Sequence, residues 1–230
     1  MADIGYGYGS ECHLLRYLGR HRNEFDKQVL SAIGQGGKIE WVDFPFEPNK
    51  TWADAEWKGL DFLSDRKVIQ TAWKEFWPQS GNVQNWDAVG WLNTGNNKEL
   101  LLVEAKAHTE ELISSCGAKP EGGLDKINKA FTETKQAFGV AGNADWLKGF
   151  YQYANRLAVL HFLTKHDIPT RLIFIYFIGD KFPESKADCP QTKEAWLPIL
   201  TEQNRALGLT GTEPSFTKVS KVFLHVSGSI

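Results

Sequence analysis

Three residues in the middle of the chain have side chains that together suit chemistry on a phosphate ester. Asp87 precedes the segment Glu104-Ala105-Lys106. Residues two apart on a strand project to the same face, so Glu104 and Lys106 are expected to lie side by side. Carboxylates are ligands that Mg²⁺ prefers, and a nearby ammonium group can orient a metal-bound water and stabilise negative charge on phosphorus. The three residue types therefore indicate metal-assisted hydrolysis of a phosphate ester.

Two apolar segments carry these residues, and their spacing predicts a β-hairpin. Residues 86–92 and 99–107 are rich in apolar side chains, and residues 93–97 between them are Asn, Thr and Gly residues typical of a turn. If the two strands pair, Asp87 lies across from Glu104, and the two carboxylates meet on an otherwise apolar sheet.

The rest of the chain alternates between helical and extended patterns, which predicts an α/β fold. Apolar residues recur at helical spacing in several segments and form strand-like runs in others. A mixed central sheet with helices on both faces accounts most simply for this order. The helices are expected over residues 10–33, 65–76, 126–138, 145–165 and 191–207, the last with a kink or break at Pro198, and the further strands over 38–46, 171–178 and 218–226.

The composition is that of one ordinary globular domain. The 230 residues are 42% hydrophobic and 23% charged, and no low-complexity tract or long linker divides them. We expect a single domain over residues 1–230, with a core at roughly 10–180 that a C-terminal helix and strand over 190–227 complete. The formal net charge of −2 excludes a globally basic nucleic-acid coat but leaves room for a local basic groove.

Asp87, followed on a second strand by Glu104-Ala105-Lys106, resembles the motif of the PD-(D/E)xK nuclease superfamily. The order of the predicted elements is also similar to the restriction-endonuclease-like αβββαβ core of that superfamily. The resemblance implies that Asp87 and Glu104 bind Mg²⁺, for which Mn²⁺ can substitute, that the Ala105 carbonyl can add a ligand, and that Lys106 positions the attacking water. The proline of the motif is absent, since Trp86 precedes Asp87.

Members of this superfamily often add a carboxylate from the first helix, and helical geometry distinguishes two candidates. At about 100° per residue, Glu11 falls within the apolar stripe that contains Leu14 and Leu18, whereas Glu24 points roughly opposite. A core-facing carboxylate is costly unless it is paired or bound to a metal, so we expect Glu11 to be the additional metal ligand. The alternative is that Glu11 only complements the helix dipole at an exposed first turn.

Further polar residues are candidates for contacts around the site. Relatives in the superfamily commonly carry a Gln on the helix after the catalytic strand, which makes Gln152 or Asn155 candidates for a supporting role or a phosphate contact. We expect Arg156 to face water. His108 continues the face of Glu104 and is a candidate for proton transfer or phosphate binding, although a surface position is the expectation for a lone histidine past a strand end.

These observations predict a Mg²⁺-dependent nuclease that hydrolyses phosphodiester bonds, in DNA rather than RNA. The alternative is a nuclease-like fold that binds nucleic acid or acts as a scaffold without chemistry, and a third possibility is an enzyme acting on a small phosphorylated substrate. A homodimer would bring two such sites to two strands.

The remaining signals concern location. The three cysteines lie far apart and form no CxxC pair, the N-terminal sequence has no secretory pattern, and no apolar stretch is long enough to span a bilayer. We therefore expect a cytoplasmic protein that does not contact a membrane.

Overall fold

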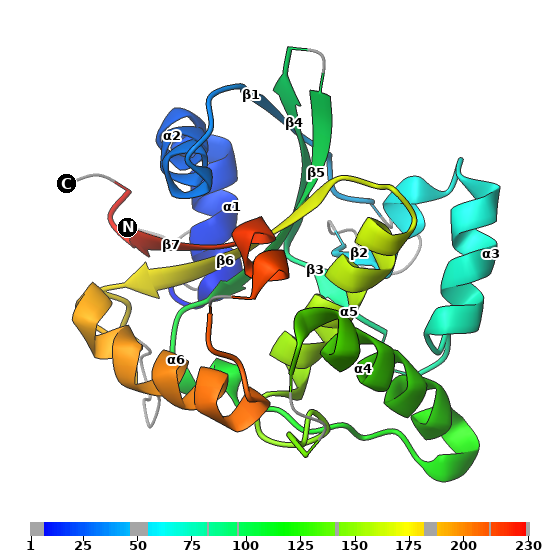
Figure 1. Ribbon diagram of the computed structural model, residues 1–230. Helices are drawn as coiled ribbons and strands as arrows, with labels where there is room; N and C mark the ends of the chain where they lie inside the picture. Colours follow the sequence, from blue (N-terminus) through cyan, green and yellow to red (C-terminus); the bar gives the residue numbers. More distant parts are fainter. Residues whose placement is uncertain are drawn as a thin grey trace.

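A five-stranded mixed sheet forms the centre of the computed structural model, which describes residues 7–46, 55–81, 83–95, 97–140, 143–181, 188–211 and 213–228 (Figure 1). The strand order is β1-β4-β5-β6-β7; the pairs up to β5 are antiparallel, and the pairs from β5 to β7 are parallel. A second sheet consists of two short strands, β2 and β3. The strands are β1 (Lys38–Trp41), β2 (Trp57–Lys58), β3 (Asn85–Trp86), β4 (Ala88–Thr94), β5 (Asn97–Lys106), β6 (Thr170–Ile178) and β7 (Val219–His225).

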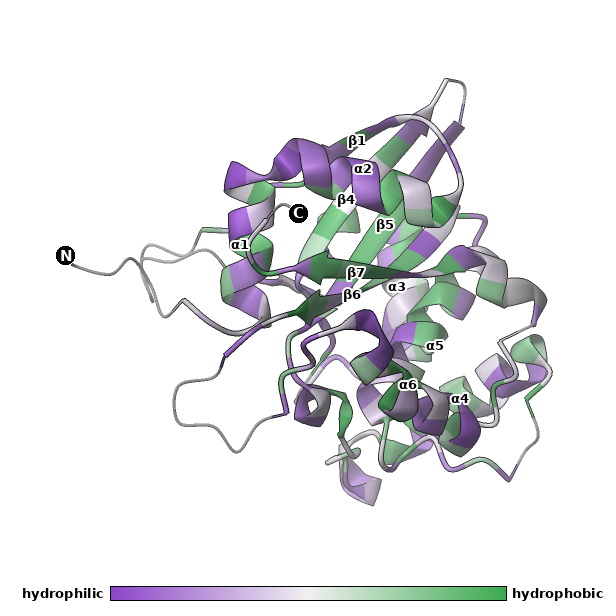
Figure 2. Cartoon of the chain, turned by 90° about the vertical axis from the view of Figure 1, so that its left-hand side faces the viewer, coloured by the Kyte–Doolittle hydropathy of each residue, from purple (hydrophilic) through white to green (hydrophobic). Residues whose placement is uncertain are grey.

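Helices cover both faces of the large sheet, as the sequence predicts. Two helices pack with one hydrophobic cluster on one face, and four helices surround a larger, aromatic-rich cluster on the other (Figure 1). Figure 2 shows the strands between these layers as mainly hydrophobic. The first pair is α1 (Ser10–Arg20) and α2 (Arg22–Ile33), and the second group is α3 (Lys67–Phe76), α4 (Leu124–Phe138), α5 (Tyr151–Lys165) and α6 (Lys193–Leu207).

The predicted hairpin is confirmed, and its register positions the candidate residues. β4 and β5 pair antiparallel from Ala88 opposite Val103 to Thr94 opposite Asn97. Along β5, the odd-numbered residues 101, 103 and 105 join the cluster beneath α1 and α2, whereas 100 and 102 join the cluster around α5. Because side chains alternate along a strand, Glu104 continues the row that faces α5.

Helix 10–33 is predicted as one element, but the structure divides it at His21. The N–H of His21 still bonds to the carbonyls of Arg16 and Tyr17, and a new helix begins at Arg22. Tyr17 and Phe25 both pack toward the sheet, with ring centroids 6.0 Å apart. Buried residues on both sides of the break therefore join the same cluster on the sheet.

Two other predicted boundaries are corrected. α5 begins at Tyr151 rather than at residue 145, because the preceding segment is held in turns: Trp146 Nε1 donates to the carbonyl of Leu207, and Phe150 bridges to Ser114. α6 continues through Pro198. The expected strands over 38–46 and 218–226 are shorter, and only the core of each pairs with a neighbour.

The structure also bears on membrane contact. Among the residues that it describes, no helix combines the length and the apolar character that a bilayer-spanning segment requires.

Candidate active site

Asp87 lies between β3 and β4, where the chain passes from the small sheet into the large one. Its backbone N–H donates to the carbonyl of Val103 at 3.2 Å, and its side-chain Oδ2 accepts the backbone N–H of Ala105 at 2.6 Å. The hairpin register, continued by one residue beyond β4, puts Asp87 opposite Glu104. The backbone amide that follows Glu104 thus fixes the carboxylate of Asp87 next to it.

Glu104 is buried on β5, and both of its carboxylate oxygens contact cations. Lys106 Nζ lies 2.5 Å from Oε1, while Arg156 Nε and Nη2 lie 2.8 and 2.6 Å from Oε2. The side chain of Glu104 is 4% exposed, and those of Lys106 and Arg156 are 13% and 3% exposed. Charge-assisted hydrogen bonds from two directions therefore hold this carboxylate in one orientation.

The pKa values reflect an uneven distribution of positive charge. Burial opposes ionisation of Glu104, but Arg156 and Lys106 outweigh it and lower the pKa of this carboxyl. Burial and the charge of Glu104 raise the pKa of Asp87 well above its usual value, against the opposing effects of Lys106 and the Ala105 amide. Burial disfavours the charged form of Lys106, but Glu104 and Asp87 outweigh it and raise its pKa. Among the described residues, two cations contact Glu104 directly, whereas no ion pair joins Asp87 to a cation and Lys106 acts on Asp87 only as a nearby charge.

These groups border a cavity of about 850 Å³ between the end of β5 and the start of α5. Carboxylates outnumber cations among its charged lining residues, so the cavity attracts a cation more readily than a bare polyanion. The charged lining residues are Glu11, Glu56, Asp87, Glu104, Glu121, Lys106, Lys119 and Arg156.

Gln152 and Asn155, both predicted from the sequence, border this cavity from α5. Asn155 is 6% exposed, and its Oδ1 accepts a hydrogen bond from Arg156 Nη1 at 2.8 Å. The side chain of Tyr151 also hydrogen-bonds Asn155. The structure thus brings Asn155 into the network around Glu104, whereas Gln152 lines the wall as a half-buried side chain.

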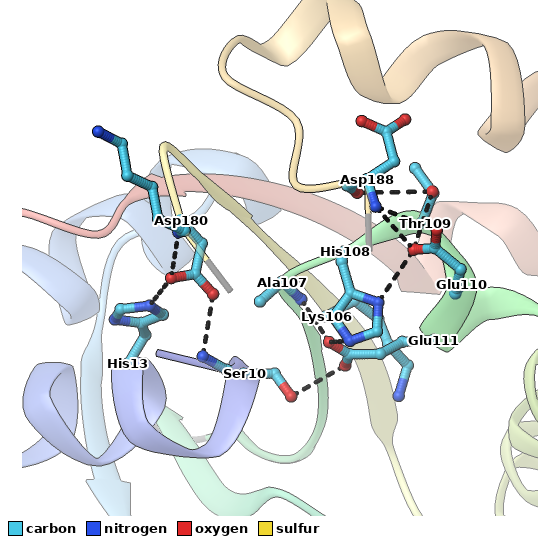
Figure 3. Close-up of polar contacts among 12 residues, drawn as sticks. Ser10, His13, Lys106, Ala107, His108, Thr109, Glu110, Glu111, Asp180 and Asp188 are labelled. Carbon is cyan, nitrogen blue, oxygen red and sulfur yellow. Dashed lines mark hydrogen bonds and ion pairs between the residues drawn. The ribbon is translucent and has the colours of Figure 1, made fainter. Parts of the chain in front are cut away.

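His108 lies just beyond the end of β5 and contacts two carboxylates instead of lining the cavity. Its Nδ1 lies 3.1 Å from Glu110 and its Nε2 lies 3.0 Å from Glu111. Figure 3 shows Glu111 between His108, the hydroxyl of Ser10 and the backbone N–H of Ala107, to which it bonds at 2.9 and 3.1 Å. This cluster connects the end of β5 to the first residue of α1.

A second contact fixes the first turn of α1 to the end of β6. Asp180 Oδ2 accepts the backbone N–H of Gly9 at 2.9 Å, and Asp180 Oδ1 lies 2.9 Å from Nε2 of His13 (Figure 3). Glu11 lies in this turn at the cavity, but its side chain is exposed. The expectation that Glu11 faces the core is therefore wrong, because no preceding helical turn covers a residue so close to the helix start. Its role as a third metal ligand stays a prediction.

Arg156 is buried, and the expectation that it faces water is wrong. Its guanidinium lies between Glu104, the carbonyl of Asn85 and the ring of Trp86. The sequence feature that indicates burial of Arg156 is the apolar run Leu157-Ala158-Val159-Leu160. Because this run is apolar on every side of the helix, α5 has no face there that is exposed to solvent. A polar residue on such a helix must find a buried partner.

The donor set suits a hard divalent cation held by few protein ligands. Asp87 and Glu104 supply carboxylate oxygens, and no group of three or more His, Cys, Asp or Glu residues able to hold a metal occurs in the described ranges. Mg²⁺ is commonly bound by one or two carboxylates together with waters and substrate phosphate, whereas structural zinc requires four protein ligands. The residues present therefore fit Mg²⁺ or Mn²⁺ and do not fit structural zinc.

Comparison with known proteins adds no family assignment. No protein-family model matches this chain, and neither a curated protein nor a solved structure matches it.

Proposed function

We propose that this protein is a Mg²⁺-dependent nuclease that hydrolyses phosphodiester bonds in DNA, on a restriction-endonuclease-like fold. The observation that carries the proposal is the hydrogen bond from the Ala105 amide to Asp87 Oδ2, at 2.6 Å. This bond fixes the carboxylate of Asp87 beside Glu104 and Lys106, and all three side chains line one cavity. Two carboxylates and an ammonium group are the combination needed for metal-assisted attack of water on phosphorus.

Each side chain has a separate role in the proposed reaction. Asp87 and Glu104 would hold the divalent cation, which supplies Lewis-acid activation of the phosphodiester and of water. Lys106 would position the attacking water and stabilise the negative charge that develops on the phosphate oxygens. Asn155 and Arg156 would keep Glu104 in place, and Gln152 would contact the substrate from the cavity wall.

The acidic lining of the cavity supports a requirement for metal. A phosphodiester that approached Asp87, Glu104, Glu11 and Glu56 without a cation would meet net repulsion. The order of elements also supports the fold assignment. The first helices, the antiparallel strands β1, β4 and β5, then α5 and β6 occur in the αβββαβ order, with β2, α3 and β3 inserted after β1 and α4 inserted after β5.

A second candidate function is a binding or scaffolding module without chemistry. The observation that favours it is the 2.5 Å ion pair between Lys106 and Glu104, which together with Arg156 satisfies this carboxylate without any metal. In this alternative Asp87 would be only a buried structural carboxyl, and the cavity would bind its ligand without hydrolysing it.

The test is a cleavage assay on purified full-length protein with supercoiled plasmid, linear duplex DNA, single-stranded DNA and single-stranded RNA. Each substrate is incubated with Mg²⁺, with Mn²⁺ or with EDTA. Lys106→Ala is the inactive variant, and Lys98→Ala is the matched control, because Lys98 lies on the same strand but is exposed near the hairpin turn.

We expect metal-dependent cleavage of DNA by the wild type and by Lys98→Ala, and a loss of about 10²-fold or more for Lys106→Ala with an unchanged circular dichroism spectrum. Cleavage by Lys106→Ala at the wild-type rate would overturn the mechanism. Nucleic-acid binding without cleavage of any substrate would favour the binding module.

A further inference from the structure

Arg156 connects the segments that form the candidate active site. From α5, its Nε and Nη2 both contact Oε2 of Glu104 on β5, and Nη2 also donates to the carbonyl of Asn85 on β3 at 2.6 Å. The guanidinium carbon lies 4.7 Å from the centre of the Trp86 ring. Asn85 and Trp86 directly precede Asp87, so a single buried side chain fixes the two carboxylates relative to each other.

The two oxygens of Glu104 are held in different ways. Oε2 accepts the Nε–H of a rigid, buried guanidinium, whose Nη2 lies 2.6 Å from the same oxygen and donates to the carbonyl of Asn85; arginine provides this planar arrangement and lysine cannot. Oε1 contacts a single group among the described residues, the ammonium of Lys106, on a flexible side chain that is 13% exposed. Lys106 can therefore move away from Oε1 more easily than Arg156 can move away from Oε2.

The proposed function requires a divalent cation at Asp87 and Glu104, and the inference rests on it. We infer that Arg156 is a positioning residue that binds Oε2 of Glu104 and so orients this carboxylate toward Asp87. Lys106, in turn, competes with the metal ion for Oε1. Lys106 then neutralises the carboxylate in the metal-free protein, and metal binding releases its ammonium group into the cavity, where the water and the phosphodiester bind.

This arrangement gives the two cations opposite effects on metal affinity. Arg156→Lys keeps the positive charge but loses the planar guanidinium that donates to both Glu104 and the Asn85 carbonyl, and loss of a group that orients a ligand typically weakens metal binding about 10–100-fold. Lys106→Met removes the competing ammonium while it preserves the unbranched aliphatic chain, so metal binding should strengthen roughly 3- to 10-fold. A purely structural role for either residue does not predict opposite signs.

The experiment is a titration of the full-length protein with Mn²⁺, in the absence of nucleic acid, that follows free Mn²⁺ by electron paramagnetic resonance. Arg171→Lys is the matched control, because Arg171 contacts the carboxylate of Glu99 with its Nε and does not line the cavity. Thermal unfolding without metal measures whether each variant remains folded.

Weaker binding by Arg156→Lys, tighter binding by Lys106→Met and unchanged binding by Arg171→Lys would support the inference. Mn²⁺ binding by the wild type that neither variant alters would overturn it and leave the proposed function standing. Absence of Mn²⁺ binding by the wild type would overturn the proposed function and the inference with it. If Arg156→Lys does not fold, the Lys106→Met titration decides: tighter binding supports the competition, and unchanged or weaker binding overturns it.

Discussion

His13 Nε2 lies 2.9 Å from Asp180 Oδ1, and each of the two side chains is 2% exposed. The partner oxygen of the same carboxylate accepts the backbone N–H of Gly9. One residue at the end of β6 therefore holds the turn of α1 that carries Glu11 to the cavity.

Asp180→Ala is expected to loosen this turn and destabilise the protein. The substitution removes the acceptor of the Gly9 amide and the carboxylate beside the buried ring of His13, which costs about 1–3 kcal/mol of unfolding free energy. Urea denaturation measures this loss, and hydrogen exchange is expected to accelerate in the first turn of α1. Asp188→Ala, which removes an exposed carboxylate, serves as the control and should change stability by less than about 0.5 kcal/mol. Equal effects of the two substitutions would contradict the role assigned to Asp180.

Asp87 and Glu104 are expected to respond in opposite directions to removal of their charge. Glu104→Gln leaves Arg156 and Lys106 without their anion and should cost about 3 kcal/mol of stability. Asp87→Asn keeps an acceptor for the Ala105 amide but removes a carboxylate that burial and Glu104 disfavour, so stability should rise by about 1 kcal/mol.

Both variants are expected to lose hydrolysis, since each removes a proposed metal ligand. Chemical denaturation in EDTA separates their effects on stability from any effect of metal. A loss of stability for Asp87→Asn as large as that for Glu104→Gln would show that the positive charge is shared evenly between the two carboxylates, contrary to the contacts described.

Glu99 is expected to make stability depend on pH in the acid range. Burial opposes its ionisation, but Lys218 and Arg171 outweigh it and lower its pKa. A carboxyl with a lowered pKa in the folded protein contributes stability above its unfolded pKa, and this contribution is lost as the pH falls through the folded pKa. Glu99→Gln should therefore cost about 1 kcal/mol at neutral pH and little once the pH falls below the lowered pKa of Glu99.

Denaturation curves for Glu99→Gln and the wild type at several pH values give this comparison. Glu40→Gln is the control, because the Glu40 side chain is 53% exposed in its ion pair with Lys38. A constant difference in stability between Glu99→Gln and the wild type at every pH would refute the assigned cause.

Two glycines are expected to give opposite effects when replaced by alanine. A Cβ at Gly90 would lie 2.8 Å from the ring of Trp41, which stacks on Phe25, so Gly90→Ala should destabilise the β1–β4 pair by about 1–3 kcal/mol. Gly19 is exposed in α1 and a Cβ there meets no atom within 4 Å, so Gly19→Ala should stabilise the helix by about 0.5–1 kcal/mol. Thermal unfolding of the two variants tests both signs together.

The pattern of apolar and turn residues in the sequence was sufficient to predict strands that pair with the next strand along the chain. The β4–β5 hairpin was predicted from two apolar runs around a turn, and β6 from a continuous apolar run, because each signal lies within one continuous segment of the chain. The break at His21 was not predicted, because the helical spacing of the apolar residues continues across it, from Leu14 and Leu18 to Phe25. The late start of α5 depends on contacts of Trp146 and Phe150 with distant segments.

The same division applies to the candidate site. The sequence by itself determined that Asp87 faces Glu104 and that Lys106 shares the face of Glu104, since antiparallel pairing and strand alternation follow from residue spacing. Only the tertiary structure decided that Arg156 is buried against Glu104, that Glu11 reaches the cavity from an exposed turn, and that His108 binds carboxylates outside it. These contacts join residues that lie on different elements, and their geometry depends on how helices pack on the sheet, which no local pattern encodes.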